Sequence, residues 1–437
     1  MTITSITNRY DKYKDSGIEW IGEIPDSWNV KRLKVLASIQ TGNTPPKENS
    51  SEDYYTEQGF LWVKPDNLDN FNPIKTTNEY LNNEGIKIAR VVPANTPLIC
   101  CIGSIGKFGV SNKSVAFNQQ INAILFKKEL VNTKFGLYYL SSQEEQHWFY
   151  SNGNVVKILN AQNQGKICCT CPSISEQEAI AGYLDRKCRA IDETIEKQKS
   201  VIEKLKEYKQ SIITQAVTKG LDKSAPMKDS GIEWIGQIPQ HWEISKIKFS
   251  AIVNPKYNEN LSSDTLVSFA PMECLTNCNL ECKDAILDSV LGSYTYFTNN
   301  DIIMAKVTPC FENGNIALAT NLNNGVGFGS SELYVFRSIN IYNKFLLYLL
   351  QNTQFKDKAI ATMYGTGGLK RVSIEFVKNY KFACPDIKEQ EQIAEFLDKK
   401  CSEIDKTIED KEKLIEKLVE YKKSLIYECV TGKRKAI

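Results

Sequence analysis

The chain has 437 residues, with 54 lysines and arginines against 52 aspartates and glutamates, and a formal net charge of +2. A chain this close to neutral cannot bind nucleic acid through its overall charge, so any such affinity must come from local patches. No apolar run approaches the roughly 20 residues that span a membrane, and the polar N-terminus lacks the apolar core of a signal peptide. Thirteen cysteines, several at apolar positions of predicted helices, indicate reduced thiols. We therefore expect a cytoplasmic protein.

The first half begins with a lead segment, Lys14–Gly22, followed by Ile24, Pro25 and Trp28. In residues 35–170, which come next, short β-type runs alternate with turn signals. The runs are Phe60–Val63, Pro97–Ile102 and Ile121–Phe126, and a helical patch follows at Phe135–Trp148. This mixture predicts an α+β globule.

A long helix is predicted from Glu176 to Val217, because apolar residues recur there at alternating steps of four and three. This heptad spacing is what a helix needs to pack along a partner helix. Ser173, three residues ahead of Glu176, has the spacing of a capping box, which marks the helix start. Gln198 and Lys209 interrupt the apolar seam with polar side chains. The predicted apolar seam residues are Leu184, Ile191, Ile195, Ile202 and Leu205.

The second half repeats both elements in the same order. The lead segment returns as Lys228–Gly236 with Ile238, Pro239 and Trp242. The helix returns, shifted by 213 residues, as Glu389–Val430. Its predicted seam residues are Leu397, Ile404, Ile408, Ile415 and Leu418, with the polar Lys411 and Lys422 in place of Gln198 and Lys209.

The region between these two elements, residues 249–383, is again a mixture of strands and helices. Its β-type runs are Thr265–Phe269, Asp301–Ala305 and Glu332–Phe336, and its helical patch is Lys344–Met363. Its sequence does not align in any obvious way with residues 35–170. The two halves therefore combine matched supports, which are the lead segments and long helices, with unmatched inserts, which are residues 35–170 and 249–383.

These elements predict an α+β fold with an internal pseudo-twofold repeat. Two globular mixed α/β domains would be joined by two long helices that pair with each other along their matched seams. The predicted segments are the first domain at 14–171, the central helix at 172–220, the second domain at 228–384 and the C-terminal helix at 385–432. The simpler alternative, two separate surface helices with solvated Glu and Lys faces, does not explain why both seams match.

Matched supports that carry unmatched inserts suit a protein that presents two different recognition surfaces. An internal near-twofold also suits a target with the backbone symmetry of duplex DNA. Two modules at a fixed separation can read half-sites on one face of DNA, as symmetric dimers do about 34 Å apart. The layout therefore favours sequence-specific DNA binding.

Several motifs resemble those of type I restriction–modification specificity subunits, and the resemblance extends over nearly the whole chain. The Ile-Pro-x-x-Trp lead segments are one of them. Gly103–Lys107 with Phe117–Gln120, and Ala305–Gly314 with Gly327–Glu332, resemble two common patterns of the family's target recognition domains. The most specific motif, Pro-x-x-x-Glu-Gln-x-x-Ile-x-x-x-Leu at each helix start, is formed by Pro172, Glu176, Gln177, Ile180 and Leu184 and by Pro385, Glu389, Gln390, Ile393 and Leu397.

The resemblance implies a function and a set of partners. It implies two globular mixed α/β target recognition domains on double-stranded DNA. These would be separated by two long antiparallel helices, which form a coiled-coil spacer and act as a molecular ruler between two half-sites. It implies docking of methylation subunits, which we expect to number two, and of restriction subunits in the complete complex. S-adenosylmethionine, ATP and Mg would bind to the partner subunits, so this chain is expected to bind no cofactor and to catalyse no reaction.

Candidate DNA-binding residues are side chains that can read bases or phosphates. Asn and Gln pair with adenine, Arg and Lys pair with guanine, and Lys, Ser and Thr contact phosphates. In the first domain the candidates are Thr44, Lys64, Ser104, Lys107, Asn118, Gln119 and Gln120. In the second domain they are Lys306, Thr308, Asn313, Ser330, Ser331, Lys370 and Arg371. The competing interpretation of Asn118–Gln120 is a hydrogen-bonded turn in a solvated loop.

Signals for catalysis are weak. Asn254–Tyr257 lacks the second proline of the amino-methyltransferase signature Asn-Pro-Pro-Tyr. Gly103–Lys107 lacks the spacing of a phosphate-binding loop. The two histidines, His147 and His241, have no Ser or Cys catalytic setting, so we expect structural or solvent-facing roles for them.

Cysteine spacing gives little support to a metal site. Cys274, Cys278 and Cys282 recur at steps of four. Structural zinc sites usually pair two Cys-x₂₋₄-Cys knuckles or combine cysteine with histidine, and this chain has only two histidines. We therefore expect ordinary reduced thiols and no metal ion.

Two alternatives to a specificity subunit remain open. The chain could be the recognition part of a fused modification–restriction enzyme, although it lacks the catalytic signatures. It could also be a scaffold or inhibitor that occupies methylation subunits without reading DNA.

Overall fold

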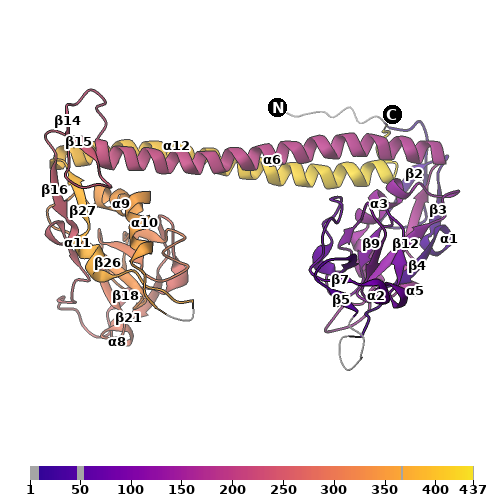
Figure 1. The fold of residues 1–437 in the computed structure, drawn as a ribbon, viewed down its shortest axis with the longest axis horizontal. Helices are drawn as coiled ribbons and strands as arrows, with labels where there is room; N and C mark the ends of the chain where they lie inside the picture. The colour runs from indigo at the N-terminus through magenta and orange to yellow at the C-terminus, as the bar shows by residue number, and fades with distance from the viewer. Residues whose placement is uncertain (1–8, 47–53, 366–367, 437) are drawn as a thin grey trace. The chain divides into compact units, whose positions relative to one another are not determined.

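The computed structural model describes residues 9–46, 54–365 and 368–436, and the chain divides into two compact units (Figure 1). The first unit comprises residues 1–197 and 413–437, and the second comprises residues 198–412. α6 (Ile174–Lys219) and α12 (Ile387–Val430) are continuous helices of 46 and 44 residues. Each contributes one part to each unit, so the boundary between the units falls inside both helices rather than at their ends.

In the first unit, two sheets form a globular α+β module. One sheet has the strand order β10-β9-β12-β4, and the other has the order β5-β7-β6-β11-β8. The strands of these sheets are β4 (Ala37–Thr41), β5 (Tyr55–Thr56), β6 (Phe60–Val63), β7 (Tyr80–Leu81), β8 (Val91–Val92), β9 (Leu98–Cys100), β10 (Phe108–Gly109), β11 (Val115–Phe117) and β12 (Ile121–Phe126). The short helices are α1 (Leu33–Leu36), α2 (Asn83–Ile88), α3 (Thr133–Ser141), α4 (Glu144–Phe149) and α5 (Ala161–Gln164), with a 3-10 turn η1 (Pro65–Asn67).

The second unit also contains two sheets. Their strand orders are β17-β26-β23-β24 and β21-β18-β25-β22. The strands are β17 (Ala251–Val253), β18 (Leu266–Ala270), β21 (Lys283–Ile286), β22 (Thr295–Thr298), β23 (Ile302–Ala305), β24 (Ile316–Leu318), β25 (Val326–Gly329) and β26 (Leu333–Ser338), with a small hairpin of β19 (Leu275–Thr276) and β20 (Asn279–Leu280). The helices are α7 (Ile247–Ser250), α8 (Leu287–Val290), α9 (Asn343–Gln351), α10 (Thr353–Ala361) and α11 (Ile374–Asn379), with 3-10 turns η2 (Met272–Cys274) and η3 (Asn323–Gly325).

Apart from the additional edge strand β5 in the first module, the two modules share one topology, although their sequences do not align in an obvious way. In the first sheet of each, the order β4-β12-β9-β10 corresponds to β17-β26-β23-β24, and every neighbouring pair is antiparallel. In the second sheet of each, one internal pair is parallel, β6 with β11 and β18 with β25. The internal repeat therefore extends through the inserts as well as through the lead segments and helices.

The lead segments fold as two-stranded hairpins against the end of a long helix. The first hairpin is β1 (Tyr13–Asp15) with β2 (Glu23–Pro25), and the second is β14 (Met227–Asp229) with β15 (Gln237–Pro239). Each is followed by a strand that pairs with the strand leading into the long helix: β3 (Asn29–Arg32) with β13 (Cys168–Cys171), and β16 (Glu243–Lys246) with β27 (Lys381–Cys384). The lead-segment tryptophans, Trp28 and Trp242, are fully buried, so these segments belong to the unit cores.

In each unit, parts of α6 and α12 pack side by side along the predicted heptad seam (Figure 1). In the first unit, Ile191 and Ile195 share a core with Leu425 and Ile426. In the second unit, Ile213 shares a core with Ile393 and Leu397 through the adjoining module. All ten predicted apolar seam residues are buried or half-buried, as the heptad pattern leads one to expect.

Polar contacts between α6 and α12 show the relative direction of the two helices. In the second unit, Lys411 Nζ donates to Gln198 Oε1 at 2.9 Å, and Lys209 Nζ lies 2.7 Å from the Asp405 carboxylate. As the residue number rises along α6 it falls along α12, so the helices are antiparallel. The first unit repeats the ion pair with the helices exchanged, since Lys422 Nζ lies 2.6 Å from an Asp192 oxygen.

Both long helices begin with a capping residue, at the predicted Ser173 and at the equivalent position Asp386. The Ser173 hydroxyl accepts from the Glu176 N–H at 3.3 Å, and Asp386 accepts from the Glu389 N–H at 2.9 Å. The glutamate side chains bind residues in the lead segments or just before them. Glu176 accepts from the Tyr10 hydroxyl at 2.8 Å, and Glu389 accepts from the Trp242 indole at 3.0 Å. Each helix start is therefore fastened to the segment that begins its unit.

The glutamine that follows each glutamate holds the module against the helix. Gln177 donates to the Leu130 carbonyl at 3.1 Å and accepts from the Asn132 N–H at 2.8 Å. Gln390 accepts from the Tyr342 N–H at 2.8 Å. Both glutamines are 1% exposed. The Glu-Gln pair of the sequence motif thus joins three elements: the lead segment, the long helix and the module.

Candidate nucleic-acid interface

The first-unit candidates gather where β6 and β11 end. These two strands are parallel, and the Asn118 N–H donates to the Val63 carbonyl at 3.0 Å, so Lys64 and Asn118 lie at the same end of the sheet. Lys107 Nζ donates to the Pro65 carbonyl at 2.8 Å, which brings the turn after β9 to the same place. The structure therefore groups residues that lie far apart in the sequence.

Within this group, Asn118 holds the turn. It is 5% exposed, its Nδ2 donates to Gln120 Oε1 at 3.0 Å, and its Oδ1 accepts from the Gln120 N–H at 3.1 Å. A side chain at Gly42 would place its Cβ 2.2 Å from the Asn118 carbonyl oxygen, so glycine is needed where the β4 strand end crosses the turn. The hydrogen-bonded turn that the sequence left open is present, and it uses Asn118 and Gln120 internally.

Gln119 points outward between these two residues. Its side chain is exposed, and its Oε1 accepts from the Thr44 hydroxyl. Ser104 is also exposed, in a tight turn where Gly103 and Gly106 both have positive φ. These side chains are accessible donors and acceptors of the kind that can contact a base edge or a phosphate.

The cations of this group are partly neutralised. Lys64 forms an ion pair with Glu79 and lies 4.7 Å from the centre of the Trp62 ring. Glu79 lies in a loop fifteen residues after Lys64, and no spacing pattern in the sequence links the two. Lys107 is bonded to a neutral carbonyl oxygen, and among the described residues it forms no ion pair.

In the second unit, three separate segments meet. Lys306 Nζ donates to the Ser331 carbonyl at 2.7 Å. The Thr308 hydroxyl donates to the Gly368 carbonyl at 2.8 Å and accepts from the Lys370 N–H at 3.0 Å. Six of the seven second-domain candidates therefore form one cluster, the exception being Asn313.

An ion pair braces this second cluster. The Arg371 guanidinium donates twice to Glu332, at 2.8 Å for each bond. These hydrogen bonds lower the pKa of Glu332 below its usual range, with a smaller contribution from the nearby Lys306 charge. Glu332, which was not among the candidates, lies just before β26 and joins it through Arg371 to the segment that follows α10. Lys370 is exposed, and its ammonium has no ion-pair partner among the described residues.

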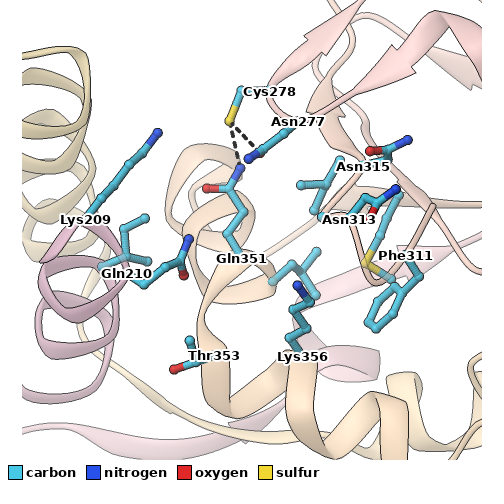
Figure 2. Close-up of a pocket in the computed structure, with 15 residues that line it drawn as sticks. Lys209, Gln210, Asn277, Cys278, Phe311, Asn313, Asn315, Gln351, Thr353 and Lys356 are labelled. Carbon is cyan, nitrogen blue, oxygen red and sulfur yellow. Dashed lines mark hydrogen bonds between the residues drawn. The ribbon is translucent and has the colours of Figure 1, made fainter. Parts of the chain in front are cut away.

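Asn313 lies apart from the cluster, in a crevice between the module and α6 (Figure 2). The crevice has a volume of about 200 Å³. Figure 2 shows Lys209 and Gln210 projecting into it from α6, opposite Asn313 and Asn315, with Gln351 between the two sides. Gln351 donates to Cys278 Sγ at 3.1 Å. This crevice could not be predicted from the sequence, because the residues that line it come from segments far apart in the chain.

No metal site is formed by the residues that the structure describes, since they contain no group of three or more His, Cys, Asp or Glu side chains placed to hold an ion. Nor does any helix within the described ranges combine the length and apolarity that crossing a bilayer demands. The chemistry that the two clusters offer is hydrogen bonding and positive charge.

The chain matches the family model described as the type I restriction modification DNA specificity domain over residues 25–204 and 284–418. It is 34% identical over 162 residues to the type I restriction enzyme EcoAI specificity subunit of Escherichia coli, a match that covers 36% of this chain and 27% of that protein. It is 24% identical over 413 residues to the MjaVIII specificity subunit of Methanocaldococcus jannaschii, with 89% of each chain covered.

Solved structures support the same fold. One chain, from work on complex assembly and conformational transition of the type I R-M system, has a TM-score of 0.70 at 12% identity and covers 93% of this chain and 98% of its own. The HsdS subunit from Thermoanaerobacter tengcongensis has a TM-score of 0.52 at 13% identity, with 94% and 98% covered. The α+β fold with paired long helices is therefore confirmed. Because the family model matches well over half of the chain, this protein belongs to the type I restriction–modification specificity family.

Proposed function

We propose that this chain is the DNA-reading subunit of a type I restriction–modification complex and that each unit reads one half of a bipartite site. The observation that carries this proposal is the pairing of one topology with two different surfaces. Both modules are built on the same strand order and fastened to a long helix by the same glutamine contacts, yet their exposed candidates differ. Such a molecule suits two unlike half-sites.

The exposed side chains suggest how each unit contacts DNA. In the first unit, the Gln119 amide matches the donor and acceptor that adenine presents in the major groove, and Lys107 and Ser104 can contact the backbone. In the second unit, Lys370 and Lys306 supply charge for phosphates, and Ser331 supplies a hydroxyl. Asn118 and Arg371, which hold their own loops, position these groups.

The paired helices would set the spacing between the half-sites and dock the partner subunits. Two methylation subunits and, in the complete complex, restriction subunits are the proposed partners, in the cytoplasm. S-adenosylmethionine, ATP and Mg would act in those partners, so this chain contributes recognition and no chemical step. The relatives that match it are themselves named specificity subunits, which supports this division.

Two exposed amides, one in each unit, allow a matched test. Gln119→Ala removes an amide worth about 1–3 kcal/mol of discrimination if it contacts a base. Asn313→Ala removes a comparable exposed amide that lies outside the second-unit cluster. Single-molecule methylation mapping of cells that carry the chain with its partner subunits would give the recognised sequence of each variant. We expect Gln119→Ala to relax one half-site and leave the other intact. Asn313→Ala is the control, because its side chain lies in the crevice beside α6, and we expect it to leave both half-sites intact.

Equal loss at both half-sites in either variant would contradict modular reading. A scaffold or inhibitor predicts no sequence-specific methylation even with the unaltered chain. A fused enzyme predicts that the isolated chain binds the methyl donor, which a titration with S-adenosylmethionine would detect.

A further inference from the structure

The segment that follows α4 in the first unit forms a small hairpin, Asn152–Ile158. Its two end residues exchange backbone hydrogen bonds of 2.9 and 2.7 Å. The hairpin is also fastened to the turn that carries Ser104, because the Gly103 N–H donates to the Lys157 carbonyl at 3.2 Å. The hairpin therefore borders the candidate interface, although none of its residues was a candidate.

The second unit has the same arrangement in the segment that follows α10. There, Tyr364 and Arg371 exchange backbone hydrogen bonds of 3.1 and 2.8 Å, and the Thr308 N–H donates to the Lys370 carbonyl at 2.9 Å. Each bond has its equivalent in the first-unit hairpin. Lys157 is therefore the counterpart of Lys370, which is a proposed phosphate contact.

In both units this arrangement lies next to an exposed side chain that is proposed to contact DNA. These side chains are Gln119 and Ser331, and in each unit the following residue donates its backbone N–H to the side chain of the preceding residue, at 3.1 and 3.2 Å. One backbone segment connects each to its hairpin. Cys101 donates to the residue after Gln119 at 2.8 Å and accepts from the residue after the hairpin at 2.8 Å, and Lys306 makes the same two bonds at 3.0 and 2.8 Å.

The tip of the first-unit hairpin is apolar and projects into solvent. Val155 is 97% exposed and Val156 is 50% exposed, so the tip contributes little to the core. Glycine is needed to form it, because Gly153 has a φ of +107° and a Cβ there would lie 2.2 Å from the Val156 carbonyl oxygen. Gly365 is in the same position, since its Cβ would lie 2.2 Å from the Leu369 carbonyl oxygen. Both units thus keep a glycine-dependent turn that is exposed.

We infer that the Asn152–Ile158 hairpin is a further DNA contact of the first unit, in which Lys157 binds a backbone phosphate and Val155 contacts the methyl group of a thymine. The inference rests on the proposed function. Lys157 is exposed, and within the described ranges its ammonium takes part in no ion pair. The hairpin contains no aspartate or glutamate that would repel DNA. Apolar side chains distinguish thymine by its methyl group in the major groove.

The phosphate contact is tested by the salt dependence of DNA binding. The full chain, in complex with its methylation subunits, is titrated with a duplex that carries its mapped site. Lys157→Ala should reduce the slope of log K against log salt by about one and weaken binding to all sequences alike. Lys128→Ala is the matched control, because Lys128 is exposed and follows β12 at the end of the strand opposite to Gln119. It should leave the slope unchanged.

The base contact is tested with uracil, which differs from thymine only by the missing methyl group. Thymines are replaced one at a time in the half-site that Gln119→Ala relaxes. One replacement should weaken binding by the unaltered complex about fourfold, as expected for one buried methyl group. The same replacement should have no effect on Val155→Ala. Both substituted side chains are exposed, so the variants should unfold at the same temperature as the unaltered chain.

The inference is overturned if Lys157→Ala has the same salt slope as Lys128→Ala, or if no uracil replacement distinguishes the unaltered complex from Val155→Ala. If Gln119→Ala still relaxes its half-site in that case, the proposed function stands without the hairpin. A complex of the unaltered chain that recognises no sequence overturns both. Loss of the methylation subunits from Val155→Ala during gel filtration would show that the tip contacts protein, and this result also overturns the inference.

Discussion

At His147, burial of the side chain disfavours the charged form of the imidazole ring. Its pKa falls from 6.5 to about 4 because the folded chain excludes water from the ring. The folded-state pKa is therefore below the unfolded one, and the unfolded chain takes up a proton first as the pH falls. The free energy of unfolding must decrease between about pH 6.5 and pH 4.

For this residue alone, the loss between pH 7 and pH 5 is about 2 kcal/mol, from the two pKa values and the linkage relation. Urea unfolding of the first unit at both pH values, followed for the unaltered chain and for His147→Ile, measures it as a difference. The variant should lack this part of the pH dependence. Identical pH dependence in the two proteins would mean that His147 is already charged or accessible in the folded chain.

Among the candidate DNA-binding residues, the roles of neighbouring side chains within the fold could not be predicted from the sequence. The Asn118–Gln120 segment forms a turn, and Gln119 in that turn binds Thr44. What could not be read from the sequence is which of the three amides faces outward. The Asn118 side chain is fully used in hydrogen bonds to Gln120. This arrangement depends on the close approach of Gly42, at the end of a strand some eighty residues earlier in the chain. The partners Glu79 and Glu332 were missed for the same reason, since side chains that meet only in the fold leave no spacing signal.

At the scale of elements, the helix starts carry the most informative pattern in the chain. The Glu-Gln pair is a motif in the sequence, and the structure gives its physical reason. The glutamate binds the lead segment, and the glutamine, almost fully buried, binds backbone groups at the start of α3 or α9. Removing the glutamine leaves a buried N–H without its acceptor, which is costlier than losing an exposed hydrogen bond.

Gln390→Ala should therefore destabilise the second unit by about 2 kcal/mol. Urea denaturation that resolves the two units gives the change directly. Glu391→Ala is the control, because that neighbouring side chain is exposed on the same helix turn, and it should change the free energy of unfolding very little. A Gln390→Ala protein as stable as the control would show that the contact with Tyr342 contributes nothing.

The long helices were predictable to within a few residues because their heptad spacing is local. The shared topology of the two modules was not, because strand order depends on which distant segments pair. β9 and β23 occupy the same place in their sheets, yet only a few residues around them resemble each other. Hydrophobic runs predicted Phe60–Val63 and Ile121–Phe126 as strands, and both ranges are strands in the structure. The runs carried no information on the parallel pairing of β6 with β11.

At the scale of the whole molecule, the repeat is a repeat of contacts as well as of sequence. Lys209 with Asp405 and Lys422 with Asp192 are the same ion pair with the helices exchanged. Both pairs combine a mostly buried ammonium with a half-exposed carboxylate, so each contributes little to stability and more to register. Ser200 and Lys413 occupy equivalent positions midway between the two pairs. An insertion after both residues leaves each ion pair intact within its own unit.

We predict that one heptad inserted after Ser200 and a second after Lys413 lengthens the proposed spacer without changing either half-site. Seven helical residues add about 10 Å along the axis, which corresponds to about three base pairs at 3.4 Å each, with only about 20° of drift in the seam. Methylation mapping should then return the original half-sites with a longer gap. A heptad in α6 alone is the control, because it leaves the two ion pairs out of register with each other and should abolish modification. If the doubly extended chain still recognised the original gap, the helices would not determine the spacing, and the separation of the half-sites would have to be fixed by the partner subunits.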